Sequence, residues 1–125
     1  MNYKKDVVFA GRVSAEELGR LTGACLALAY VSFFEGFGIP LLEGMSCDVP
    51  VIASNVSSMP EVGADAALYV DPASVESIAD ALAKIDNDAE LREALISSGR
   101  RRRNDFSWDK TAKLLWASIE KVVPV

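Results

Sequence analysis

The stretch that decides this fold is Phe34-Glu35-Gly36-Phe37-Gly38-Ile39-Pro40-Leu41-Leu42-Glu43. It carries two carboxylates, Glu35 and Glu43, which are eight positions apart, with glycines and a proline between them. Pro40 suits a first helical turn, where its missing N–H costs little, so we expect a helix over about residues 39–47. N–H groups at a helix start attract phosphate, whereas carboxylates accept hydrogen bonds from hydroxyls. The stretch therefore predicts a site for a phosphorylated sugar or a nucleotide sugar.

The two carboxylates also have ordinary explanations. Acidic residues such as Glu43 are common in the first turn of any helix, and a loop carboxylate such as Glu35 is usually solvated. The glycines between them match neither the GxGxxG dinucleotide-binding pattern nor the Walker A loop. From these residues alone, a sugar-phosphate site and a purely structural turn both stay open.

Outward from this stretch, short apolar runs alternate with helical patterns. The apolar runs predict four buried strands, at residues 6–10, 25–31, 50–54 and 67–70. Further helices are expected over 14–23, from Ser58 onward, over 73–85, over 88–103 and from Ser107 onward. This alternation is typical of a parallel α/β sheet with right-handed crossovers. We therefore expect one domain over residues 1–125, with a Rossmann-like sheet of about four strands and flanking helices.

Composition narrows the class of protein. The 125 residues are half apolar and a quarter charged, with a net charge of −5, which indicates a globular domain and argues against broad nucleic-acid binding. The chain has no histidine, which excludes Ser-His-Asp and Cys-His catalysis within it. Cys25 and Cys47 lack metal-ligand spacing, and we expect them to be buried free thiols. Met1 precedes a polar segment rather than the apolar core of a signal peptide, so we expect a cytoplasmic protein.

Four other groups of residues have structural explanations that we favour over ligand binding. Their expected roles are a solvated helix end for Arg100-Arg101-Arg102-Arg103, helix capping for Ser57 and Ser58, a helix-to-helix turn for Asp86-Asn87-Asp88, and core or interface anchors for Phe106, Trp108 and Trp116.

The longer stretch from Ser32 to Met45 resembles the Glu-x7-Glu signature of the retaining GT-B glycosyltransferases, group 1 (family 4). More motifs of this family follow in order, at residues 50–54, 59–62, 66–72, 91–92, 99–100 and 106–108. The resemblance covers nearly the whole chain. It implies part of the C-terminal domain of a GT-B fold, which binds a nucleotide diphosphate sugar and needs no essential metal.

The resemblance also assigns site residues. Glu35 would be the catalytic residue, at the donor hexose, and Glu43 would bind the ribose hydroxyls. The other donor-binding positions would be Gly36 and Phe37 at the hexose, Gly38, Ile39 and Leu41 at the diphosphate, and Arg12 and Val13 at the base.

Some features depart from the family pattern. Glycine is usual at the position of Asp48 and alanine at that of Gly44, and we expect these changes to affect packing and the turn rather than the site. Family members also carry an N-terminal acceptor-binding domain and an earlier strand-helix-strand segment with a basic pair for the diphosphate, which are not found here. The strand at 6–10 would then either pair directly with that at 25–31 or leave sheet edges exposed for self-association.

These observations lead to one expected function and two alternatives. We expect the donor-binding portion of a glycosyltransferase that moves a sugar, with retention, to an acceptor glycan or lipid carrier. It would be inactive alone, because the cleft needs a second wall, and peripheral to the membrane in a full-length enzyme. A non-catalytic nucleotide-sugar-binding or assembly module, acting with a separate acceptor subunit, is the alternative. A different Rossmann-type enzyme, such as an oxidoreductase, is disfavoured by the absence of GxGxxG.

Overall fold

A parallel sheet lies at the centre of the computed structural model, which describes residues 3–123. Within that range the sheet has three strands, in the order β1 (Leu28–Tyr30), β2 (Val51–Ser54) and β3 (Ala67–Val70). The register places Ala53 of β2 between Tyr30 of β1 and Tyr69 of β3. Every residue of the central strand β2 is buried, as expected for a parallel strand covered on both faces. The predicted parallel α/β architecture is confirmed.

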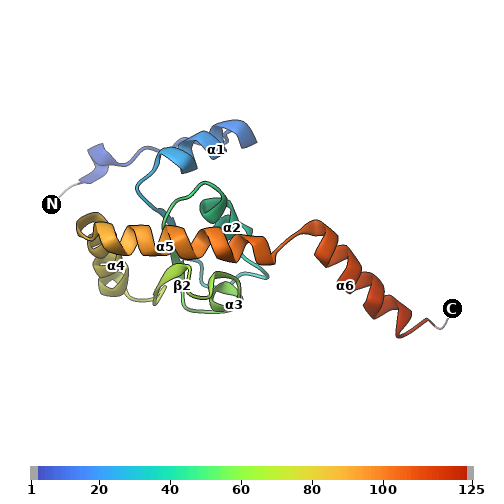
Figure 1. The fold of residues 1–125 in the computed structure, drawn as a ribbon. Coiled ribbons are helices and arrows are strands. Elements are labelled where there is room, and N and C mark those ends of the chain that lie inside the picture. Colours follow the sequence, from blue (N-terminus) through green and yellow to red (C-terminus); the bar gives the residue numbers. More distant parts are fainter. Residues whose placement is uncertain (1–2, 124–125) are drawn as a thin grey trace.

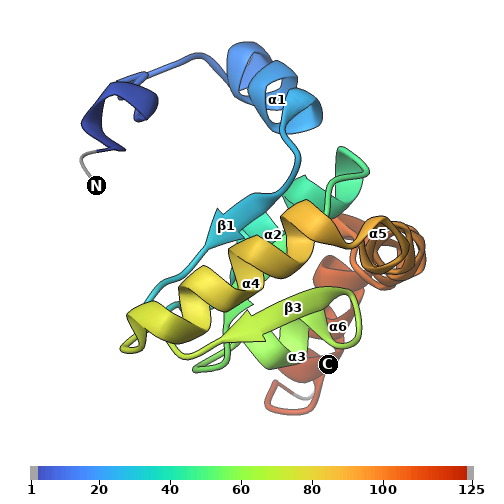
Figure 2. The same ribbon diagram turned by 90° about the vertical axis from the view of Figure 1, so that its left-hand side faces the viewer.

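Helices cover both faces of the sheet (Figure 2). On one face, α2 (Ile39–Ser46) and α3 (Met59–Gly63) form a core with Val51 and Ala53. On the other, α4 (Val75–Asn87) and α5 (Ala89–Arg102) form a second core with Ile52 and Val70. Because side chains alternate along β2, consecutive residues of that strand serve the two cores in turn.

The helix starts follow the predicted caps in three cases. Ser14 and Glu17 form a reciprocal capping box before α1 (Ala15–Ala24). The side chain of Asp88 accepts from the Leu91 N–H at 2.8 Å before α5, and that of Ser107 caps α6 (Trp108–Glu120). The side-chain cap expected at Ser58 before α3 is wrong, because the Ser58 hydroxyl donates instead to the Glu35 carbonyl at 3.0 Å.

The strand predicted at residues 6–10 is wrong. The segment begins with a 3₁₀ turn, η1 (Tyr3–Asp6), and residues 7–10 form no regular structure. Val8 and Phe9 are 86% and 93% exposed. A strand needs a neighbour for its backbone hydrogen bonds, and in the described part of the chain nothing pairs with the outer edge of β1. The direct pairing of 6–10 with 25–31 is thus not formed, and self-association through sheet edges stays a prediction.

The last helix, α6, extends away from the sheet and its covering helices (Figure 1). Phe106, just before it, is partly buried and packs edge-on against Phe37, with ring centroids 5.8 Å apart. Trp108 and Trp116 are 82% and 59% exposed, so a core role for them is wrong. Their role as interface anchors stays a prediction.

The sequence predicts that the arginine block at the end of α5 is a solvated helix end, and the structure differs. Arg102 donates to the carbonyls of Glu61 and Val62, at 2.6 and 3.0 Å, at the end of α3. Arg103 donates to the carbonyls of Met45 and Ser46, at 3.0 and 3.2 Å, at the end of α2. A cation near a helix C-terminus satisfies free carbonyls and complements the helix dipole. The end of α5 therefore joins both helices of one sheet face.

Asp48 has a left-handed backbone, with φ 57°, which explains why glycine is usual at its position in the resembled family. Aspartate tolerates this conformation better than most residues. Its carboxylate is held by Arg100 at 3.0 Å and Arg103 at 3.2 Å. The Arg100 hydrogen bond is the largest cause that lowers the pKa of Asp48.

The two cysteines are free, as expected, but neither is fully buried. Cys25 is exposed because it lies where the chain leaves α1, and its thiol donates to the Thr22 carbonyl at 3.0 Å. Cys47 is half-buried at the end of α2. No helix within residues 3–123 has the length and apolar character that a bilayer span requires.

Gly63 of α3 offers a test of the packing on the sheet. A Cβ at this position would clash with the Tyr69 hydroxyl and lie 3.2 Å from the Ala67 Cβ. We expect Gly63→Ala to lower the free energy of unfolding by about 1–3 kcal/mol, measured by urea denaturation. Gly19→Ala in α1 is the matched control, because no described residue has an atom that the added Cβ would meet within 4 Å and alanine favours helix. Equal unfolding midpoints for the two variants would contradict this packing.

Candidate functional site

A single left-handed glycine ends the loop after β1 and begins α2. Gly38 is buried, with φ 103°, and a Cβ there would lie 3.0 Å from the Met59 sulfur. Its carbonyl accepts from the Leu41 N–H at 3.1 Å, which closes the first turn of α2. Because the strands are parallel, this loop lies at the carboxyl edge of the sheet, where open α/β folds bind ligands.

Glu35 is held in this loop through one of its two carboxylate oxygens. The Tyr30 hydroxyl donates to Oε1 at 2.6 Å, and the Ser32 hydroxyl donates to the same atom at 2.9 Å. Oε2 accepts no hydrogen bond from any described residue. The two bonds, that from Tyr30 first, lower the pKa of Glu35. The site therefore presents an ionised carboxylate with one oxygen available.

The backbone of Glu35 is held from the neighbouring loop, between β2 and α3. Its N–H donates to the Ser57 hydroxyl at 3.1 Å, and its carbonyl accepts from the Ser58 hydroxyl at 3.0 Å. Ser57 has φ 53°, which is uncommon for a residue with a side chain. Sequence reasoning treated these serines as caps. No pattern along the chain links them to Glu35, because the partners are 22 and 23 positions apart.

Glu43 lies on α2, one turn beyond the helix start, and is exposed. Among the described residues its carboxylate makes no hydrogen bond or ion pair. Its charge nevertheless reaches the Tyr30 phenol. The pKa of Tyr30 is raised, chiefly by the hydrogen bond to Glu35 and in smaller part by the charges of Glu35 and Glu43. Tyr30 is thus a site residue that sequence reasoning missed, bonded to one carboxylate and influenced by the charge of the other.

Between the two carboxylates, some backbone N–H groups are available to a ligand and others already donate within the protein. Those of Gly38 and Ile39 make no hydrogen bond within residues 3–123. That of Leu41 already donates to Gly38, and the Leu41 side chain is fully buried in the core. Gly36 and Phe37 are exposed in the loop. The structure therefore brings Glu35, the N–H groups at the helix start, and Glu43 together along one edge.

Arg12 and Val13 are not brought to this edge. They lie in the segment that precedes α1, and Figure 2 shows that segment apart from the sheet. No hydrogen bond or ion pair among the described residues joins them to the stretch from Phe34 to Glu43. Their assignment to the base of a nucleotide stays a prediction.

An apolar pocket of about 440 Å³ adjoins the loop. Its lining combines the loop, α2 and the start of α6, and consists of Phe37, Ile39, Leu42, Phe106, Ser107, Trp108 and Thr111. The hydroxyls of Ser107 and Thr111 already bond within α6, so the pocket offers mainly apolar surface to a ligand.

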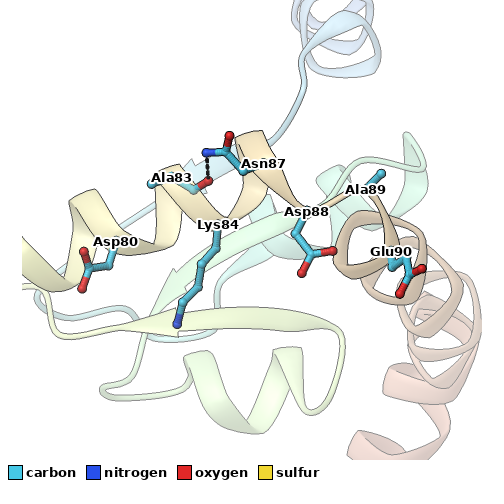
Figure 3. A pocket seen from close by; sticks show the side chains of 7 residues that line it. All are labelled: Asp80, Ala83, Lys84, Asn87, Asp88, Ala89 and Glu90. Carbon is cyan, nitrogen blue, oxygen red and sulfur yellow. Dashed lines mark hydrogen bonds between the residues drawn. The ribbon is translucent and has the colours of Figure 1, made fainter.

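A wider and more open depression of about 770 Å³ lies at the junction of α4 and α5 (Figure 3). It is remote from Glu35, because α4 returns from the carboxyl edge of the sheet to the opposite end. Its polar side chains do not converge in Figure 3, and Asn87 and Asp88 serve the turn. The predicted helix-to-helix turn is confirmed. No group of three His, Cys, Asp or Glu side chains in residues 3–123 could hold a metal ion.

The Tyr30–Glu35 hydrogen bond can be tested by phenol titration. We expect Glu35→Gln to lower the pKa of Tyr30 toward that of an ordinary phenol, because the largest cause of its shift is removed. The measurement is tyrosine absorbance against pH, with Tyr30→Phe to assign the transition. Glu43→Gln removes an equal charge without the hydrogen bond, so its effect should be smaller. A larger effect for Glu43→Gln would contradict the geometry.

Comparison with known proteins relates this geometry to a family. The family model described as glycosyl transferases group 1 matches residues 1–102. The O-antigen chain mannosyltransferase B of Escherichia coli is 43% identical over 101 residues, which are 81% of this chain and 26% of that protein. The MMP alpha-(1->4)-mannosyltransferase of Mycolicibacterium hassiacum is 34% identical over 116 residues, with coverages of 89% and 28%.

A solved structure agrees with the family match. Sucrose-phosphate synthase from Thermosynechococcus elongatus superposes with a TM-score of 0.80 and 27% identity, over 95% of this chain and 31% of that one. The chain thus spans 26–31% of the length of these three proteins. It belongs to the group 1 glycosyltransferases, and its fold matches part of the C-terminal domain of a GT-B enzyme.

Proposed function

We propose that this chain is the donor-binding portion of a retaining glycosyltransferase and that it holds a nucleotide diphosphate sugar at the start of α2. One observation carries the proposal. The carboxylate of Glu35 lies in the same loop as the N–H groups of Gly38 and Ile39, and within the described part of the chain one carboxylate oxygen and both N–H groups have no partner.

The two kinds of group suit two parts of such a donor. Unpaired N–H groups at a helix start favour the diphosphate, because they donate to its oxygens and carry the positive end of the helix dipole. Carboxylates would repel phosphate but accept hydrogen bonds from vicinal hydroxyls. We therefore assign Glu35 to the hexose hydroxyls and Glu43 to the ribose hydroxyls. The proposed binding requires no metal.

The names of two similar proteins suggest which donor and which acceptor to propose. Both proteins are named mannosyltransferases, and the name of one places its reaction on an O-antigen chain. We propose a mannosyl donor and a growing glycan acceptor. Sugar transfer also needs the acceptor to be positioned against the donor. Since the chain corresponds to 26% of the Escherichia coli relative, we propose that residues 1–125 alone bind donor without transferring it.

Donor binding is tested by calorimetric titration of the chain with GDP-mannose, UDP-glucose and ADP-glucose in the presence of EDTA. We expect one donor to bind, GDP-mannose first among them. Glu43→Gln should weaken that binding about tenfold, because a hydrogen bond to a charged group contributes on the order of 1.5 kcal/mol.

Glu90→Gln is the control for the loss of one charge, because Glu90 lies at the junction of α4 and α5, remote from the proposed site (Figure 3). It should bind as the wild-type chain does. Binding that is unchanged in Glu43→Gln, or lost equally in Glu90→Gln, would remove Glu43 from the ribose. Dependence of binding on a divalent ion would contradict the metal-free site.

Transfer is tested with a radiolabelled donor and a mannose-terminated oligosaccharide. We expect no labelled product from residues 1–125 alone at donor concentrations that saturate binding. Measurable product would show that this chain contains a complete active site, contrary to the proposal. Saturable binding without transfer fits both a donor-binding portion and the non-catalytic module. Transfer after addition of a separate acceptor-domain protein would favour the donor-binding portion, and continued absence of transfer would favour the non-catalytic module.

A further inference from the structure

We propose that Tyr30 and Ser32 are positioning residues, which saturate one oxygen of Glu35 so that only the other is offered to a ligand hydroxyl. The inference deepens the donor-binding function proposed above and rests on it. It concerns side chains outside the glycine-rich stretch.

The carboxylate geometry supports this role. A carboxylate has about four lone-pair positions on two oxygens. The hydroxyls of Tyr30 and Ser32 both donate to Oε1, at 2.6 and 2.9 Å, and fill that oxygen. Oε2 keeps both of its positions, since no described residue donates to it. An unrestrained loop carboxylate would instead rotate and offer either oxygen.

Tyr30 connects Glu35 to the rigid part of the molecule. It is a residue of β1, in register with Ala53 of the fully buried strand β2, and its ring packs against the core beneath α2. A functional side chain that is bonded to a strand is held more narrowly than one that depends on its own loop. The hydrogen bond from the Tyr30 phenol therefore fixes the Glu35 carboxylate relative to the sheet.

The backbone of Glu35 is fixed from a second direction. The Ser57 hydroxyl accepts from its N–H, and the Ser58 hydroxyl donates to its carbonyl. Ser57 holds its left-handed conformation beside this contact. The side chain is thus held from β1 and the main chain from the turn after β2, so the carboxylate has little freedom left.

A matched pair of tyrosines makes the test specific. Tyr69 of β3 pairs with the same residue, Ala53, from the other side, and its hydroxyl donates to the Ala64 carbonyl at 3.0 Å. Tyr30→Phe and Tyr69→Phe each remove one hydroxyl and keep the packed ring. Only the first loses a bond to Glu35. Ser32→Ala removes the second donor, at a half-buried position in the loop after β1.

Two measurements on these three variants test the inference. The first is the pKa of the Glu35 carboxyl, followed by NMR with labelled glutamate in the chain without donor. The second is the calorimetric affinity for the donor that the wild-type chain binds. Tyr30→Phe and Ser32→Ala should raise the pKa of Glu35 and weaken donor binding about five- to tenfold. Tyr69→Phe should change neither.

The outcomes separate this inference from the proposed function. An unchanged Glu35 pKa in Tyr30→Phe, or equal effects of the two tyrosine variants, would overturn the positioning role. If the pKa rises but donor affinity stays at the wild-type value, the positioning has no consequence for the ligand and the inference is also overturned. If the wild-type chain binds no donor, the proposed function fails, and the NMR result alone decides how Glu35 is held.

Discussion

The left-handed backbone of Gly38 determines where the loop after β1 ends and where α2 begins. Its φ of 103° and its contact with Met59 leave no room for a side chain, so the chain turns at this residue. Three consequences follow from one conformation. Glu35 remains in the loop, Glu43 is carried onto the helix, and the N–H groups of Gly38 and Ile39 have no partner among residues 3–123.

The turn at Gly38 positions the site only if α2 stays packed on the sheet, and two features stabilise that packing. Gly44 lets the helix approach closely, since a Cβ would lie 2.9 Å from side-chain atoms of both Leu28 and Val51. At the other end of α2, Arg103 donates to the last carbonyls, while Arg102 does the same for α3. The arginines at the end of α5 thus bind together the two helices whose preceding loops form the site.

Local patterns predicted most of the fold and, at the candidate site, the position of the loop and of the helix start that carry Glu35 and Glu43. The caps at Ser14, Asp88 and Ser107 depend on residues three positions away, so they can be read from the chain. The strand at 6–10 could not be judged, because strand formation depends on a partner elsewhere. The burial of Trp108 could not be judged for the same reason, because an apolar side chain is buried only where another part of the protein packs against it. Ser57 and Ser58 were missed because the pairing of β1 with β2, rather than any motif, brings the loops after these two strands together. Tyr30 is only five positions from Glu35, but it is the last residue of an apolar strand and matches no motif for a site residue.

The central claim is that the edge between Glu35 and Glu43 binds a nucleotide diphosphate. Amide NMR of the ¹⁵N-labelled chain during addition of GDP or UDP tests this most directly, because it reports each backbone N–H separately. The account predicts that the largest shifts occur at Gly38 and Ile39, with little change at Asp88 and Glu90. Shifts centred on the junction of α4 and α5, or none at the start of α2 at saturating nucleotide, would contradict it.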